Sequence, residues 1–130
     1  MLTDQPILGM SKLTQALLNS IDYNGVKRRR RANYLRLDNE LSKFNIIKLP
    51  IDNYMVPMVY PFLTKYTGLK QKLIAEGIYV ATYWPNVYGW VESSSVEFRF
   101  AEYLVPLPVD QRLGQKELSY MINKIMRICT

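Results

Sequence analysis

The sequence predicts an α/β (α+β) two-layer sandwich, in which two N-terminal helices precede a small three-stranded sheet that alternates with helices. Apolar residues recur at helical spacing up to about residue 44, and β-favouring residues interrupted by prolines follow. Hydrophobic residues make up 48% of the 130 residues, which suffices for one core without disulfides or a structural metal. We therefore expect a single domain over 1–130, with a helical linker region over 11–44 and a small α/β domain over 55–130.

Two helices are expected in the linker region. Leu13 and Leu17 share one face of a helix over 11–20, and a longer helix over 22–44 carries a stripe of apolar side chains. The stripe consists of Tyr34, Leu37, Leu41 and Phe44. Asp22 is placed to cap the longer helix, because its carboxylate can accept a hydrogen bond from a free amide of the first turn.

Three short strands are expected in the second half of the chain, over 56–63, 78–83 and 105–109. All three are rich in β-favouring residues. The first and the third contain prolines, which lack an amide donor and therefore favour positions at a sheet edge.

Helices are expected between and after these strands. A helix over 66–76 can end at Gly77 in the left-handed conformation, and Ser94 with Glu97 has the spacing of a capping box for a helix up to residue 103. A last helix follows Gly114. Its buried stripe consists of Leu118, Met121, Ile122, Ile125 and Met126. This alternation favours a sheet that helices cover on one face.

The residue types exclude several kinds of active site. The chain has no histidine and one cysteine, Cys129, so a disulfide framework, the usual zinc sites and a Ser-His-Asp triad are all excluded. The six glycines stand singly, so there is no glycine-rich phosphate loop. A lone cysteine suits a reducing cytoplasm, and no apolar run approaches the roughly 20 residues that cross a bilayer. We therefore expect a cytoplasmic protein without membrane contact.

The formal charge of +6 suits a polyanionic partner, and a basic α/β nucleic-acid-binding module is one alternative. Such a module would use the basic run 27–31 and the aromatic segment 83–90. Successive helical residues turn by about 100°, so the run is spread around its helix, and the aromatic segment is poor in Lys and Arg. We favour a solvated helix surface or an interdomain contact for the run, and an interface for the aromatic segment.

Several segments, taken in order, resemble one protein family. The segment at 10–37, MSKLTQALLNSIDYNGVKRRRRANYLRL, is similar to the helical passage between the large and small domains of sugar aminotransferases. The likeness continues through VPMVYPFL at 56–63, LIAEGIYV at 73–80, YWP at 83–85 and LPVDQRLG at 107–114. The chain thus resembles the C-terminal, small domain of the DegT/DnrJ-like aminotransferases, which belong to fold type I of the pyridoxal phosphate superfamily.

The resemblance implies pyridoxal phosphate as the cofactor of the complete enzymes. In that family a larger N-terminal domain holds the cofactor through a Schiff-base lysine and an aspartate at the pyridine nitrogen. No lysine of this chain stands at a position that matches the family's lysine, so we expect no cofactor to be bound by this chain alone and no transamination by it alone. The expected protein is a truncated or split half of an aminotransferase, which acts as a homodimer or with a separate cofactor-binding domain.

The resemblance also implies a substrate-facing loop after the second predicted strand. Its residues are Tyr83, Trp84, Pro85 and Asn86. Amino-acid aminotransferases of the superfamily have a carboxylate-binding arginine near this point, because a guanidinium can hold a carboxylate by two parallel hydrogen bonds. The loop has no arginine, and Arg112 in LPVDQR is the nearest alternative cation. An ion pair between Arg112 and Asp110 is the competing interpretation.

Overall fold

A computed structural model describes residues 8–130, so the first seven residues of the predicted domain lie outside the described residues. The elements in chain order are α1 (Lys12–Asn19), α2 (Tyr23–Leu41), η1 (Ser42–Phe44), β1 (Val59–Phe62), α3 (Leu69–Ala75), η2 (Pro85–Gly89), α4 (Val96–Tyr103), β2 (Val105–Pro108) and α5 (Gln115–Cys129). Within this part of the chain, no helix has the length and apolar character that crossing a membrane requires.

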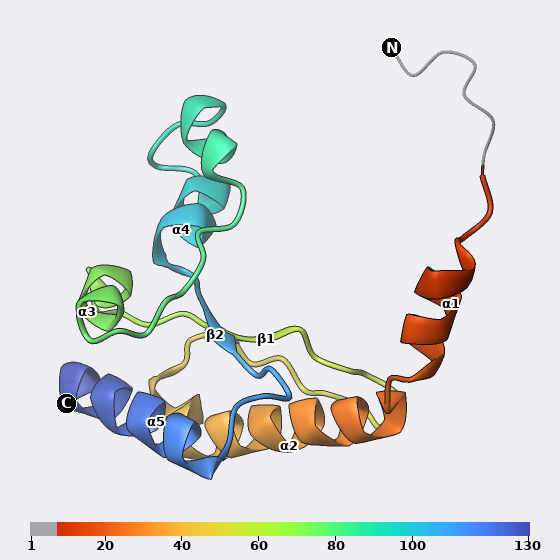
Figure 1. The fold of residues 1–130 in the computed structure, drawn as a ribbon. Coiled ribbons are helices and arrows are strands. Elements are labelled where there is room, and N and C mark those ends of the chain that lie inside the picture. The colour runs from red at the N-terminus through yellow and green to blue at the C-terminus, as the bar shows by residue number, and fades with distance from the viewer. Residues whose placement is uncertain (1–7) are drawn as a thin grey trace.

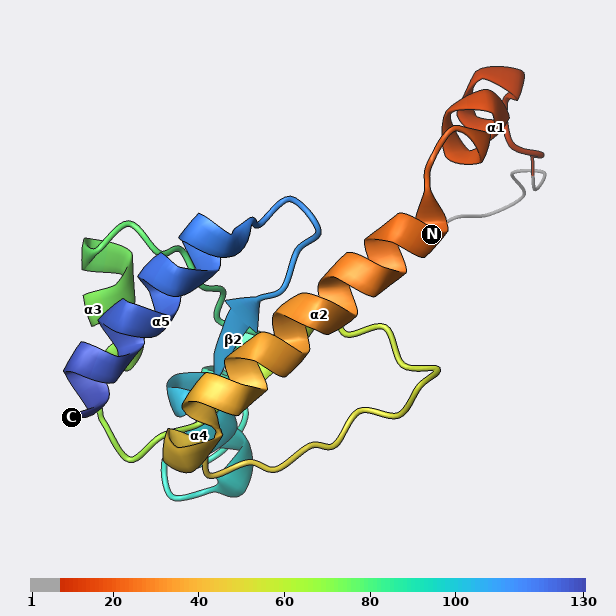
Figure 2. The same cartoon turned by 90° about the horizontal axis from the view of Figure 1, so that it is seen from below.

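The core lies between two long helices and a two-stranded sheet. α2 and α5 pack side by side beneath the sheet, and α3 packs on α5 (Figure 1, Figure 2). β1 and β2 are antiparallel, with Tyr60 opposite Leu107 and Phe62 opposite Val105. The fully buried side chains include Leu37, Leu41, Tyr60, Phe62, Leu73, Leu107, Leu118 and Ile125. The predicted α+β class is confirmed.

The predicted strand over 78–83 is wrong, because the structure has no strand there and its sheet consists of β1 and β2. The amide of Ile78 instead donates to the carbonyl of Leu73 (2.8 Å) and closes the end of α3. Gly77 has a φ of 77°, the left-handed conformation expected for this helix end. α3 also starts later than predicted, because Gly68 before it has a φ of 74°, which a right-handed helix cannot include.

Prolines make the outer edges of the sheet poor partners for a third strand. In an antiparallel pair, alternate residue pairs exchange backbone hydrogen bonds, and the residues between them direct their backbone groups outward. Pro61, Pro106 and Pro108 all stand in the same alternate residue pairs. Because proline has no amide hydrogen, the residue pairs between them form the hydrogen bonds that join β1 to β2. A strand over 78–83 placed beside β2 would therefore meet two positions without an amide donor.

Asn45 occupies the outer edge of β1 with its side chain. Its Nδ2 donates to the carbonyl of Pro61 (2.9 Å), and its Oδ1 accepts the amide of Leu63 (3.0 Å). The amide of the next residue, Ile46, donates to the carbonyl of Leu63 (2.8 Å). A loop residue thus forms the hydrogen bonds that a neighbouring strand would otherwise form.

Side-chain caps fix the starts of the helices. Asp22 caps α2 as predicted, since its Oδ1 accepts the amide of Gly25 (2.8 Å). The cap of α4 is Ser95 and not the predicted Ser94: its Oγ accepts the amide of Phe98 (3.1 Å). Three consecutive serines offer the same capping chemistry, so the sequence pattern does not distinguish among them.

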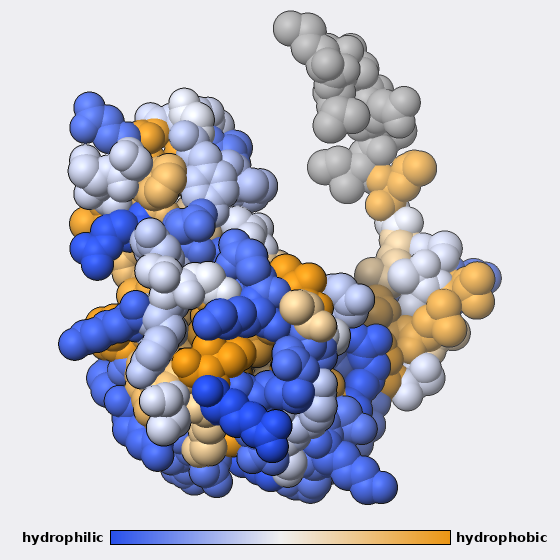
Figure 3. Space-filling model, turned by 90° about the vertical axis from the view of Figure 1, so that its left-hand side faces the viewer, coloured by the Kyte–Doolittle hydropathy of each residue, from blue (hydrophilic) through white to orange (hydrophobic). Residues whose placement is uncertain are grey.

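α1 stands apart from the core. The helix forms where the sequence predicts it, with Ser11 as its N-cap, but none of its residues is buried. Its leucines are exposed, and the space-filling view shows an apolar area that stands apart from the rest of the surface (Figure 3). We define the α1 apolar surface as Leu13, Leu17, Leu18 and Ile21. Helical periodicity therefore predicted the element correctly, although this apolar face covers no part of the described core.

The Tyr60 phenol links the sheet to α2. It donates to Oδ1 of Asp38 (3.1 Å), and its ring packs edge-on against Tyr34 with 5.0 Å between ring centroids. Burial, together with the negative charge of Asp38, raises the pKa of Tyr60 well above its usual 10.0. The folded protein therefore keeps a proton that the unfolded chain releases at high pH.

Tyr60→Phe should make the protein less sensitive to alkaline pH. Below about pH 10 the phenol is neutral in both states, and above it only the unfolded state loses the proton, so stability falls as pH rises. One such group contributes a loss of about 1.4 kcal/mol per pH unit, which the variant should not show. Urea unfolding between about pH 9 and pH 11 measures the slope. Tyr54→Phe, at a side chain that is 93% exposed, is the control. Equal slopes in wild type and Tyr60→Phe would contradict the prediction.

Candidate functional site

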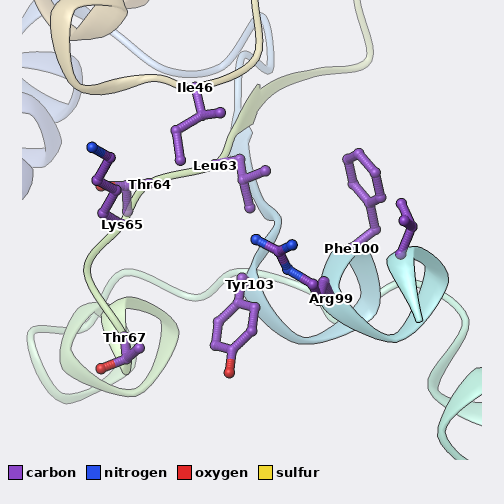
Figure 4. Close-up of a pocket in the computed structure, with 9 residues that line it drawn as sticks. Ile46, Leu63, Thr64, Lys65, Thr67, Arg99, Phe100 and Tyr103 are labelled. Carbon is purple, nitrogen blue, oxygen red and sulfur yellow. The ribbon is translucent and has the colours of Figure 1, made fainter. Parts of the chain in front are cut away.

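A cavity of about 590 Å³ opens between α4 and the segment that follows β1. Its lining residues are Ile46, Leu63, Thr64, Lys65, Thr67, Val96, Arg99, Phe100 and Tyr103. In Figure 4 the guanidinium of Arg99 points from α4 into this space, with Leu63 above it and Tyr103 below. The volume falls within the range of about 300 to 1,000 Å³ that is typical of small-molecule sites.

Two elements position the lining residues. On α4, Val96, Arg99, Phe100 and Tyr103 stand at positions i, i+3, i+4 and i+7, so they share one side of the helix. The opposite wall continues directly from the last residue of β1, and its Thr64 is buried. A regular helix and a strand end therefore set the shape of the cavity.

The cavity carries an excess of positive charge. Lys65 and Arg99 line it, and among residues 8–130 no carboxylate does. Among the hydrogen bonds and ion pairs of residues 8–130, none involves either of these two side chains. Thr64 and Thr67 add hydroxyl groups, and Ile46, Leu63 and Phe100 add apolar surface. The arrangement suits an anionic ligand that also has an apolar part.

A buried lysine ties α4 to α3 near this cavity. Nζ of Lys70 donates to the carbonyl of Ala101 (2.7 Å), and the phenol of Tyr88 donates to the same oxygen (3.0 Å). Burial lowers the pKa of Lys70, and the carboxylate of Glu102 partly offsets that effect. Because two donors from different elements share one carbonyl, Lys70 and Tyr88 fix the position of α4.

The predicted loop after residue 82 packs on the other side of α4. Tyr83 and Trp84 have their ring centroids 5.7 Å apart and line a cavity of about 250 Å³ together with Phe100 of α4. Trp84 has a φ of 51° and Pro85 starts η2, in which Asn86 follows as an exposed residue. The loop is thus an aromatic surface next to α4.

Comparison with known proteins identifies the fold. The sequence matches no protein-family model and no curated protein. One solved structure that matches is the sugar aminotransferase CalS13 from Micromonospora echinospora, with a TM-score of 0.61 and 19% sequence identity. The alignment covers 85% of this chain and 33% of that enzyme. The chain has the fold of part of a sugar aminotransferase. The resemblance that the short motifs suggested is confirmed for the fold, and the chain spans about a third of the length of the enzyme that it matches.

Arg112 forms an ion pair with Asp110. Its Nε and Nη2 donate to the two carboxylate oxygens of Asp110 (2.8 and 3.2 Å), and these bonds lower the pKa of Asp110. Arg112 follows β2, whereas α4 and the aromatic loop packed on it precede that strand. The structure therefore places Arg112 and the loop 83–86 at opposite ends of β2 and does not bring them into one cavity.

The sequence prediction missed Arg99. A signal for it was present, because the helix predicted over 94–103 carries Val96, Arg99, Phe100 and Tyr103 at helical spacing. What no pattern in the sequence revealed is that this side of the helix faces the end of β1 across a cavity. The arginine that lines the large cavity is thus not the one that the family motif indicated.

The basic run in α2 has a partly internal role. Nε and Nη2 of Arg30 donate to the carbonyls of Pro57 and Met58 (both 2.9 Å), and Arg31 donates to the carbonyls of Asp52 and Met55. Two of the five basic residues therefore fasten the segment before β1 to α2. Lys27, Arg28 and Arg29 are exposed. The run does not form one continuous basic surface.

Proposed function

We propose that this chain is the non-catalytic, substrate-covering domain of an aminotransferase, which acts with a cofactor-binding domain that its own residues do not supply. One observation carries the proposal: most of the chain shares the fold of about a third of a sugar aminotransferase. In the complete enzymes the resemblance implies a small domain that closes over the substrate while another domain holds the cofactor.

The described residues do not fit pyridoxal phosphate. The cofactor needs an amine beside a space for its ring and an acidic group at the pyridine nitrogen. The cavity beside Lys70 holds only about 10 Å³, and no carboxylate lines the cavities at Lys65 and Lys27. Lys116 shares a cavity with Glu117, but that carboxylate accepts the amide of Gly114 at the start of α5 (2.9 Å). The proposal therefore assigns this chain no step of the reaction.

Exposed apolar side chains support contact with a further domain. The α1 apolar surface consists of three leucines on a helix without a single buried residue and of Ile21 just after that helix. Nearby, Tyr23 at the start of α2 and Val56 and Met58 before β1 line a shallow cavity of about 270 Å³. Contiguous exposed apolar surface of this kind marks interaction sites in soluble proteins.

The purified chain should therefore transfer no amino group when it is mixed with pyridoxal phosphate, an amino donor and a keto sugar. It should also self-associate, because none of residues 8–130 covers the α1 apolar surface in the isolated chain. Leu13→Asp combined with Leu17→Asp should weaken that association by about tenfold or more, since each change places a charge in an apolar contact. Sedimentation equilibrium measures the association, and a coupled transaminase assay measures the transfer.

Ile74→Asp provides the matched control, because Ile74 is also an exposed apolar residue but lies on α3. Self-association of this variant should equal that of the wild type. Robust amino-group transfer by the isolated chain would refute the non-catalytic role. Self-association that the α1 variant leaves unchanged would refute the role of the α1 apolar surface.

A further inference from the structure

We propose that the cavity beside α4 binds the phosphate group of a small phosphate ester through Arg99 and Lys65, with the body of the ester on the apolar wall. The nine lining residues all belong to this chain, so binding can be tested on the chain by itself. The proposal is thus separate from the proposed function and can fail or succeed independently of it.

The charge of the cavity favours a dianion. Arg99 and Lys65 supply two positive charges, and no carboxylate among the lining residues neutralises them. A phosphate monoester carries a charge of about −1.5 to −2 at neutral pH, whereas a carboxylate carries −1. Two unneutralised cations on one cavity therefore match a phosphate better than a carboxylate.

The number of donors points to the same group. A guanidinium offers five N–H donors in a planar fork, an ammonium offers three, and the hydroxyl of Thr67 can donate as well. A carboxylate has two oxygens for these donors, and a phosphate monoester has three terminal oxygens. The guanidinium of Arg99 can hold two of the three, and the flexible side chain of Lys65 would turn toward Arg99 to reach the third (Figure 4).

The apolar lining predicts the rest of the ligand. Ile46, Leu63, Val96 and the rings of Phe100 and Tyr103 form most of the other surface. The cavity of about 590 Å³ is far larger than a phosphate group alone requires. An ester with an apolar or aromatic body would fill it and remove that surface from water.

Other arginines of the chain serve as internal comparisons. Arg112 is neutralised by Asp110, and Arg30 and Arg31 donate to backbone carbonyls. Arg99 lines a cavity and has no such partner among residues 8–130. Arg112→Gln is therefore a matched control for Arg99→Gln, because both changes remove one charge from an exposed guanidinium.

The test is a titration of the full chain with phenyl phosphate, followed by amide chemical shifts in NMR spectra. We expect saturable shifts that concentrate in residues 63–67 and 96–103. Arg99→Gln should weaken binding by about tenfold or more, and Arg99→Lys should retain part of it, because the charge stays while the fork is lost. Arg112→Gln should bind as tightly as the wild type. Added salt should weaken binding, since the site is open to solvent.

Parallel titrations with inorganic phosphate and with benzoate separate the two parts of the ligand. Weaker binding of both than of phenyl phosphate would support a site for the complete ester. The proposal would be overturned by benzoate binding as tightly as phenyl phosphate, or by equal affinity of Arg99→Gln and wild type. Shifts that centre on Arg28 and Arg29 in α2 would overturn it as well, because they would show attraction to the net charge alone.

Discussion

Leu37→Ala should lower the free energy of unfolding by about 3 to 4 kcal/mol, whereas Leu13→Ala should change it by about 0.5 kcal/mol or less. Leu37 of α2 is completely buried between α5 and the sheet, and Leu13 of α1 is 70% exposed. Removing most of the Leu37 side chain loses the free energy gained by burying it away from water. It also leaves a cavity that the surrounding side chains fill only in part. Urea unfolding of both variants against the wild type measures the difference.

The comparison isolates the effect of burial, because Leu13 and Leu37 both follow helical periodicity and differ in what covers them. Each lies in a helix that the sequence predicted, and each belongs to the apolar stripe of that helix. Alanine is a good helix former at both positions, so helix propensity contributes little to the difference. The measurement should be made at a protein concentration low enough to avoid self-association through the α1 apolar surface. Similar losses in the two variants would show that α1 belongs to the core, against the described arrangement.

Periodicity predicted which segments are helices better than it predicted what they pack against. The stripe of α2 is buried, and so are Leu118, Met121, Ile122 and Ile125 of α5. In α1 the same kind of stripe is exposed. An apolar stripe predicts that a segment is helical but not what covers the stripe, and none of residues 8–130 buries the stripe of α1.

The missing third strand shows a different limit of sequence reasoning. Residues 78–83 are rich in β-favouring types, but a strand also needs a neighbour with free amide and carbonyl groups. β2 has Pro106 and Pro108 where such a neighbour would have to pair. The composition of one segment does not contain this information, because it depends on the register of two others.

The candidate site was predictable only in part. That the loop with Tyr83 and Trp84 faces a substrate stays a prediction, and the structure shows only that the loop lies against α4. The competing interpretation of Arg112, an ion pair with Asp110, is the one that the structure has. Arg99 could not be found from a motif, because its cavity arises where α4 meets the end of β1, more than 30 positions earlier in the sequence. Local motifs report on neighbours in the chain, and this site depends on a tertiary contact.

Asn45→Ala should destabilise the fold by about 3 kcal/mol, which is a large effect for a single polar side chain. Asn45 is 5% exposed, and its amide group donates to the carbonyl of Pro61 and accepts the amide of Leu63. Alanine would leave two part-buried backbone groups without their partner, and a fully buried group of this kind costs about 1 to 3 kcal/mol. Its Nδ2 also lies 3.1 Å from the Tyr60 phenol, so a third contact is lost.

Asn86→Ala, at an exposed loop position, is the control for the same chemical change and should be close to neutral. Amide hydrogen exchange is a second measurement, and it distinguishes a local loss of hydrogen bonds at Leu63 from a general loss of stability. In the variant the amide of Leu63 should lose protection well before the amides of α5, because its acceptor is gone while the helix keeps its own hydrogen bonds. If the Leu63 amide kept its protection, some other group would have to satisfy it. The outer edge of β1 would then not depend on Asn45. The Asn45 side chain would not take the place of the third strand that the sequence predicted.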